Sequence, residues 1–109
     1  MDKIKALNSL FSTADAEDVS YSSDGYELIL KFLDWQGNQY IIKFNDVEYL
    51  KITDKINYEV FSGDSSYEII NSSLIKELKL EKNNYHHYML CFNAWTNIEI
   101  ISDKMVIKF

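Results

Sequence analysis

The feature that most constrains this chain is a pair of apolar, β-prone runs separated by a short turn, residues 26–47, YELILKFLDWQGNQYIIKFNDV. The turn sequence is Gln36-Gly37-Asn38, and glycine and asparagine between two such runs are a strong β-hairpin signal. Successive side chains of a strand point to opposite faces, so the large apolar residues of both runs gather on one side. The face expected to enter the core consists of Leu28, Leu30, Phe32, Tyr40, Ile42 and Phe44.

The length of the turn fixes the register of this hairpin. We expect a three-residue loop with Asn38 in the left-handed region of backbone space. The expected cross-strand pairs are Phe32–Ile42, Leu30–Phe44 and Asp34–Tyr40. A two-residue loop would shift the register by one residue and bring Lys43 into the apolar face, so the longer loop is preferred. The preferred register has a small cost, because Lys31 then lies opposite Lys43 on the outer face.

The rest of the chain consists of short extended runs between turns, with two helical candidates. Strands are expected near residues 18–22, 47–52, 58–61, 85–92, 97–101 and 104–109. The spacing of apolar residues predicts a short helix over residues 1–12. Ser65 and Glu68 fit a capping box, which predicts a helical turn near 66–72, while residues 74–80 fit either a helix or a strand.

Short strands, close turns and the absence of proline favour consecutive antiparallel pairing. We therefore expect one domain over residues 1–109 with an α+β, mainly β fold. Its architecture should be an antiparallel β-sandwich or curled sheet of about six to eight short strands with one or two short helices.

Charge and cysteine usage exclude several classes of function. The formal net charge is −6, and all eleven basic residues are lysines. Without arginine or a basic stripe, nucleic-acid binding is disfavoured. An acidic surface suits a basic protein partner, although it also serves simply to keep a small protein in solution. The single cysteine, Cys91, lies in an apolar run and is expected to be a small buried residue.

The N-terminus lacks the apolar core of a signal peptide, and no segment approaches the ~20 apolar residues of a membrane span. A cytoplasmic protein without membrane contact is expected.

The only imidazoles, His86 and His87, are adjacent in a predicted strand. They should point to opposite faces, so they are poorly placed to bind one metal ion together. The simplest interpretation keeps one ring half-buried and the other at the surface. Cys91 lies some 13 Å along the strand from His87 at ~3.3 Å per residue, which supports no catalytic dyad. With no phosphate-binding glycine loop either, the sequence predicts no catalytic residue, no metal site and no cofactor.

Two tryptophans, Trp35 beside the hairpin turn and Trp95 in a later connection, are the candidates for partner binding. Tryptophan buries a large area at low entropic cost and is common at the energetic centres of interfaces. Each indole could instead cover one end of the core.

The order of these signals resembles a family of small bacterial proteins called YxiG-like. The matching stretches are Asp18-Val19, the long hairpin, Phe44-Asn45-Asp46-Val47, the run Tyr85-His86-His87-Tyr88-Met89-Leu90, Ile98-Glu99-Ile100-Ile101 and Val106-Ile107. The resemblance spans most of residues 18–109. It departs from the family pattern in its lysine-only basic set and at Ser102-Asp103, where a small apolar residue is expected.

The resemblance implies a protein encoded beside a secreted bacterial toxin and acting as its immunity protein, with no catalytic residues to carry over. We therefore expect a non-catalytic protein-binding domain that occludes a cognate toxin, possible partners being basic toxin domains. An alternative is a small-molecule-binding or hydrolytic enzyme that uses His86 or His87 with an acidic residue. A further alternative is a homo-oligomeric subunit, such as a homodimer paired through a sheet edge.

Overall fold

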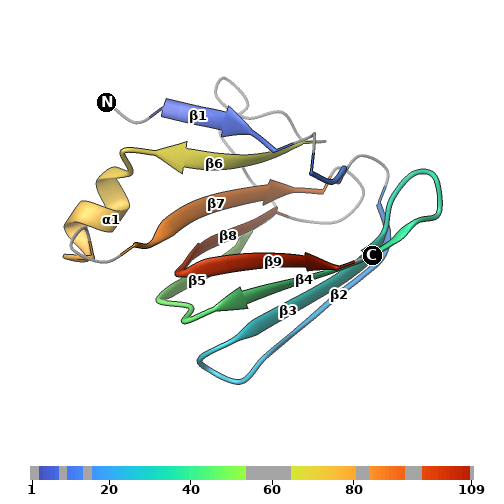
Figure 1. Cartoon of the computed structure of the whole chain (residues 1–109), viewed down its shortest axis with the longest axis horizontal. Helices are drawn as coiled ribbons and strands as arrows, with labels where there is room; N and C mark the ends of the chain where they lie inside the picture. Colours follow the sequence, from blue (N-terminus) through green and yellow to red (C-terminus); the bar gives the residue numbers. More distant parts are fainter. Residues whose placement is uncertain are drawn as a thin grey trace.

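The structure is a computed structural model, and it describes residues 3–7, 10–13, 16–53, 65–80, 84–92 and 97–108. These residues form nine strands and one short helix (Figure 1). The elements are β1 (Lys3–Ala6), β2 (Glu17–Ser23), β3 (Leu28–Leu33), β4 (Gln39–Asn45), β5 (Tyr49–Thr53), β6 (Ser66–Ile70), α1 (Ser73–Glu77), β7 (His86–Cys91), β8 (Asn97–Ser102) and β9 (Lys104–Lys108). The predicted mainly β, antiparallel fold is confirmed.

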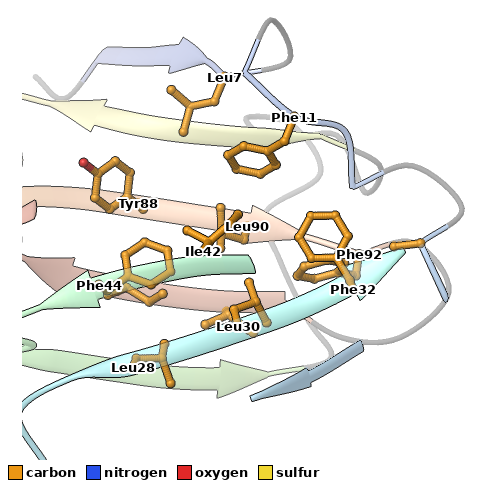
Figure 2. Close-up of a cluster of buried hydrophobic side chains, with 13 residues drawn as sticks. Leu7, Phe11, Leu28, Leu30, Phe32, Ile42, Phe44, Tyr88, Leu90 and Phe92 are labelled. Atoms are coloured by element: carbon orange, nitrogen blue, oxygen red, sulfur yellow. The ribbon is translucent and has the colours of Figure 1, made fainter. Parts of the chain in front are cut away.

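The strands are divided between two antiparallel sheets. One has five strands in the order β1-β6-β7-β8-β5, and the other has four in the order β2-β3-β4-β9. Apolar residues from both sheets form one cluster, so the sheets pack face to face as a sandwich (Figure 2). The most deeply buried members of this core are Leu28, Leu30, Phe32, Ile42, Phe44, Leu90, Ile98 and Ile100.

Aromatic rings fill the end of the core near the β3–β4 hairpin. The ring centroid of Phe32 lies 5.3 Å from that of Phe92 and 5.6 Å from that of Tyr40. Phe11 adds an edge contact, with its ring 6.2 Å from Phe32. Full burial of such a side chain contributes about 1.5–3 kcal/mol. These contacts join the two sheets to the segment that follows β1.

The β3–β4 hairpin has the predicted core face but a different register. Phe32 pairs with Tyr40 and Leu30 with Ile42, a shift of two residues from the expected pairs. The loop does contain three residues, but they are Trp35, Gln36 and Gly37, because the backbone N–H of Asp34 donates to the carbonyl of Asn38 at 2.9 Å.

Gly37, with φ of 84°, takes the left-handed position that we assigned to Asn38. Glycine adopts this conformation without steric cost, which favours the observed loop. The expected lysine–lysine pair is absent: Lys31 lies opposite Ile41, and Lys43 forms an ion pair of 3.0 Å with Glu27.

The two predicted helices are both wrong. Residues 3–6 of the expected N-terminal helix form β1, the exposed edge strand whose Lys3 and Lys5 discourage further edge pairing. Residues 66–70 of the expected helical turn form β6, which pairs with β1 on one side and β7 on the other. Hydrogen bonding to two remote strands outweighs the local capping pattern. The segment 74–80, which fitted either a helix or a strand, includes all of α1 except its first residue, Ser73. The strand expected near 58–61 lies outside the described residues.

The side chains of β7 and of Phe92, which follows it, alternate between two apolar clusters. Tyr88, Leu90 and Phe92 enter the main core. Met89 and Cys91 join a smaller apolar cluster on the other face of the sheet. Cys91 is fully buried, which confirms the expectation for this residue.

Candidate functional site

The strongest arrangement of polar side chains lies where α1 meets the outer face of the five-stranded sheet. After β6 the chain turns at Asn71, whose φ is 55°. Ser72 then caps α1, and its Oγ accepts a hydrogen bond of 3.2 Å from the backbone N–H of Ile75. Serine is a preferred N-cap residue because its oxygen satisfies one of the free N–H groups of the first turn. The cap therefore places the Ser72 hydroxyl above the sheet.

The C-terminus of α1 is fixed by a second local motif. The N–H of Leu80 donates to the carbonyl of Ile75, and that of Lys79 to the carbonyl of Lys76, each at 3.0 Å. This is the Schellman pattern, with Lys79 in the left-handed position at φ of 59°. Both ends of this one-turn helix are thus held by specific hydrogen bonds.

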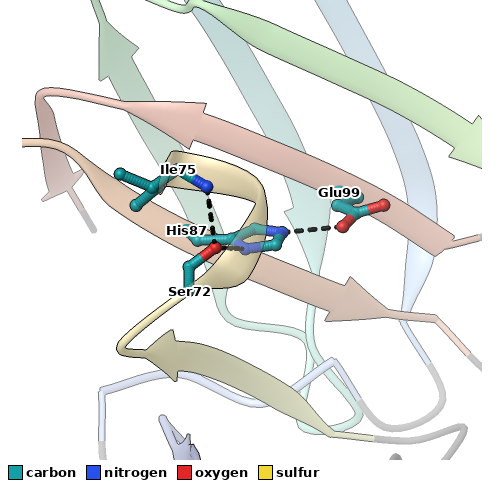
Figure 3. A network of polar contacts seen from close by, with 4 residues as sticks. All are labelled: Ser72, Ile75, His87 and Glu99. Atoms are coloured by element: carbon teal, nitrogen blue, oxygen red, sulfur yellow. Dashed lines mark hydrogen bonds and ion pairs between the residues drawn. The ribbon is translucent and has the colours of Figure 1, made fainter. Parts of the chain in front are cut away.

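Ser72, His87 and Glu99 form a continuous polar relay (Figure 3). The Oγ atom of Ser72 lies 2.6 Å from Nδ1 of His87, and Nε2 of the same ring lies 2.7 Å from Oε2 of Glu99. The three residues come from the β6–α1 connection, β7 and β8. His87 is only 3% exposed, so the centre of the relay is shielded from solvent.

The donor and acceptor roles in this relay follow from the chemistry of the groups. A carboxylate only accepts hydrogen bonds, so the hydrogen between His87 and Glu99 is on Nε2. In the neutral imidazole Nδ1 is then an acceptor, and the Ser72 hydroxyl must be the donor. Ser72 Oγ receives the N–H of Ile75 on its other side. The hydroxyl is therefore polarised towards a base that a carboxylate orients, as in serine-histidine-acid triads.

The second imidazole has its own carboxylate on the opposite face of β7. Nδ1 of His86 lies 2.8 Å from Oε2 of Glu68, and the His86 ring stacks on Tyr88 at a centroid distance of 5.9 Å. Burial, and then the negative charge of Glu68, raise the pKa of the Tyr88 phenol. The prediction that the two imidazoles point to opposite faces is confirmed, since His86 bonds to β6 and His87 to β8.

The expectation of one half-buried and one surface ring is wrong. His87 is buried and His86 is partly exposed. Each ring contacts a carboxylate on a neighbouring strand. Within the part of the chain that the structure describes, no three histidine, cysteine or acidic side chains come together as metal ligands.

An open pocket of about 250 Å³ lies beside α1. It is lined by Glu68, Ile69, Ile70, Asn71, Ser72, Ile75, Lys76, Tyr85 and His86. Its walls combine three isoleucines with a cation, a carboxylate, an imidazole, an amide and two hydroxyls. This mixture suits a small ligand that has both an apolar part and a polar group.

Tyr85 links this pocket to an acidic group at the turn after β4. Its hydroxyl donates to Oδ2 of Asp46 at 2.6 Å. This hydrogen bond, partial burial and the charges of Glu48, Asp46 and Asp103 raise the pKa of the Tyr85 phenol. Tyr85 therefore remains a neutral hydrogen-bond donor at the rim of the pocket.

The relay includes two residues, Ser72 and Glu99, that sequence reasoning missed. They lie 15 and 12 residues from His87, on separate elements. Serine–histidine–acid spacing differs between unrelated folds, so sequence distance offers no signal for such a site. The only hint was the pair of histidines.

The partner-binding candidate Trp35 lies far from this pocket. The β3–β4 hairpin that carries it and α1 are at opposite ends of the sandwich (Figure 1). Its side chain is 62% exposed. Trp95, the other candidate, is outside the described residues.

The turn beneath Trp35 is held by a buried carboxylate. Oδ1 of Asp34 accepts the backbone N–H groups of Gln36 at 2.9 Å and Asn38 at 2.8 Å, and Oδ2 accepts the side-chain amide of Asn38 at 3.3 Å. A type I turn favours aspartate at its first position for this reason. The exposed indole thus projects from a fixed backbone.

Comparison with protein-family models, curated proteins and solved structures finds no match for this chain. Among the described residues, no helix combines the length and apolar character needed to cross a bilayer.

Proposed function

We propose that this protein is a protein-binding domain, most concretely a cytoplasmic immunity protein that occludes a cognate bacterial toxin. The observation that carries the proposal is the indole of Trp35, 62% exposed on a turn that the buried carboxylate of Asp34 holds in place. The resemblance to YxiG-like proteins supplies the toxin–immunity context.

An exposed tryptophan on a fixed turn is well suited to anchor an interface. Burying the indole removes a large apolar area from water, and little conformational freedom is lost when the loop is already ordered. Interface energy is concentrated in a few such residues, with tryptophan strongly represented. We therefore assign Trp35 as the central contact of the binding surface.

The net charge of −6 suits a basic toxin domain, such as a nuclease. Opposite net charges speed the diffusional encounter of two proteins, and salt screens this effect. The association rate should therefore fall as salt concentration rises, while the dissociation rate changes less.

The test is affinity capture from the native strain with the tagged wild-type protein, Trp35→Ala and Tyr26→Ala. Tyr26 is a matched control because it is 60% exposed and precedes β3, whereas Trp35 follows it. The proposal predicts one stoichiometric partner that wild type and Tyr26→Ala retain and Trp35→Ala loses.

The captured partner is then expressed in a test host with and without this protein. Growth should be protected by the wild type and not by Trp35→Ala. Recovery of no partner, together with no protection against the product of the neighbouring gene, would overturn the proposal. Size-exclusion chromatography of the purified protein addresses the homodimer alternative.

A further inference from the structure

Ser72, at the hydroxyl end of the Ser72–His87–Glu99 relay, lines the pocket beside α1. The helix and the β3–β4 hairpin that carries Trp35 lie at opposite ends of the sandwich (Figure 1). We propose that Ser72 is the nucleophile of an acyl-transfer site that accepts small carboxylic esters in this pocket. The inference goes beyond the binding function proposed above.

The geometry meets the requirements of an activated serine. The 2.6 Å contact with Nδ1 of His87 places a base within direct reach of the hydroxyl proton. The 2.7 Å contact with Glu99 holds the ring in the tautomer that leaves Nδ1 free to accept that proton. The N–H of Ile75 donates to Oγ at 3.2 Å and so fixes the position of the hydroxyl.

The pocket indicates the class of substrate. Ser72 lines it together with Ile70 and Ile75, which provide an apolar wall for a short acyl chain. Lys76 and His86 also line it and supply polar groups for the ester end. A volume of about 250 Å³ suits a small ester.

In the first step Oγ of Ser72 attacks the ester carbonyl carbon, and its proton passes to Nδ1 of His87. A carbon–oxygen bond to Ser72 forms, the bond to the leaving alcohol breaks, and the alcohol departs with the proton from His87. In the second step His87 takes a proton from water, which attacks the acyl-serine. This releases the carboxylic acid and restores the Ser72 hydroxyl, so ester and water yield acid and alcohol.

A relay that only fastens α1 to the sheet would have the same hydrogen bonds but no reactivity. The two roles are distinguished by treating the full chain with a fluorophosphonate probe. An activated serine oxygen attacks the phosphorus of such a probe, and fluoride leaves. Intact mass and peptide mapping should show a single adduct on Ser72. The same protein should hydrolyse p-nitrophenyl acetate and be inhibited in proportion to the labelled fraction.

The control variants keep the fold and change one group each. Ser72→Gly retains an acceptable N-cap residue but removes the nucleophile, and it should lose both the adduct and the esterase activity. Ser73→Ala, at the exposed neighbouring serine, should label as the wild type does. Tyr26→Ala should also label normally, because Tyr26 is exposed and is not among the residues that line the pocket.

Glu99→Gln tests the positioning role of Glu99. It should lower the labelling rate at least tenfold over the whole pH range while circular dichroism and the melting temperature show a folded protein. Absence of a Ser72 adduct on folded wild-type protein, or an adduct that persists in Ser72→Gly, would overturn the proposal.

Discussion

The carboxylate of Asp34 and the backbone N–H of Asn38 are joined by a hydrogen bond of 2.8 Å across the turn that carries Trp35. The same oxygen accepts the N–H of Gln36. One buried side chain thus replaces the backbone partners that the loop amides lack, and it determines both the shape of the turn and the position of the exposed indole.

Replacement of Asp34 by alanine should destabilise the protein by about 2 kcal/mol, because two backbone donors lose a charged acceptor. Asp34→Asn keeps one acceptor oxygen and should cost about half as much. Urea unfolding followed by circular dichroism measures both values. Equal stability of Asp34→Ala and the wild type would show that solvent satisfies these amides equally well.

Phe32 is the residue of the core whose truncation should cost most. It is almost fully buried and its ring contacts Phe11, Tyr40 and Phe92. Phe32→Ala should lower the unfolding free energy by about 3–5 kcal/mol. The neighbouring Leu33→Ala, on the partly exposed outer face of β3, is the control and should cost clearly less. Similar losses for the two variants would contradict the assignment of the inner face.

Lys79 and Lys76 should respond in opposite directions to glycine. Lys79 is left-handed at φ of 59°, a conformation that costs a side-chain-bearing residue about 1 kcal/mol, so Lys79→Gly should stabilise the protein by about 0.5 kcal/mol. Lys76 is inside α1, and Lys76→Gly should destabilise it by about 1 kcal/mol. Thermal melts of both variants measure the sign, and destabilisation by Lys79→Gly would contradict the C-terminal motif.

Glu48 should make stability fall as pH rises through the acid range. A hydrogen bond with the Asp46 carboxyl, burial and the charge of Asp46 raise the pKa of Glu48 above its ordinary 4.5. The folded protein therefore binds this proton at pH values where the unfolded chain has lost it, and the stability that this proton provides is lost as pH rises above about 4.5.

At neutral pH Glu48→Gln should therefore gain up to about 0.5 kcal/mol, a small value because the group is exposed. The gain should vanish below the pH at which Glu48 is protonated in both states. Urea titrations at several pH values test this, and a variant less stable than the wild type at neutral pH would contradict it.

Tyr88 should give the wild type an alkaline sensitivity that Tyr88→Phe lacks. Its pKa is raised above the ordinary 10 by burial and by Glu68, so the folded state keeps the proton and its stabilising contribution is lost as pH rises above 10. Each pH unit above that value should increase the advantage of the variant by about 1 kcal/mol. A pH-independent difference in unfolding free energy would show that Tyr88 does not ionise selectively in the unfolded chain.

The inner face of the hairpin was predictable because strand alternation is a strict local rule. The register of the hairpin was also predictable from the sequence. A type I turn favours aspartate at its first position and glycine at its fourth, and Asp34 and Gly37 have this spacing. Placing the left-handed residue at Gly37 rather than at Asn38 moves every cross-strand pair by two residues.

The stretch from Ser65 to Leu80 could not be assigned from local sequence. The strand and the one-turn helix in this stretch together have apolar residues at the spacing of one continuous helix. Ser65 and Glu68 have the spacing of a capping box at the start of such a helix. Glu68 instead bonds to His86, and β6 takes its conformation from two remote strands. The candidate site depends on the same nonlocal pairing, whereas Trp35 was identifiable because it adjoins a turn.

The order of strands in the two sheets has a consequence for synthesis. β1 pairs with β6, whose residues are more than 60 positions later in the chain, and β4 gains its second neighbour only when β9 is present. Pairings between distant segments form slowly, because a long loop must close before any contact rewards it. During translation β1 must therefore remain unpaired until residues beyond 70 have left the ribosome. The charges of Lys3 and Lys5 discourage this unpaired strand from pairing with other nascent chains.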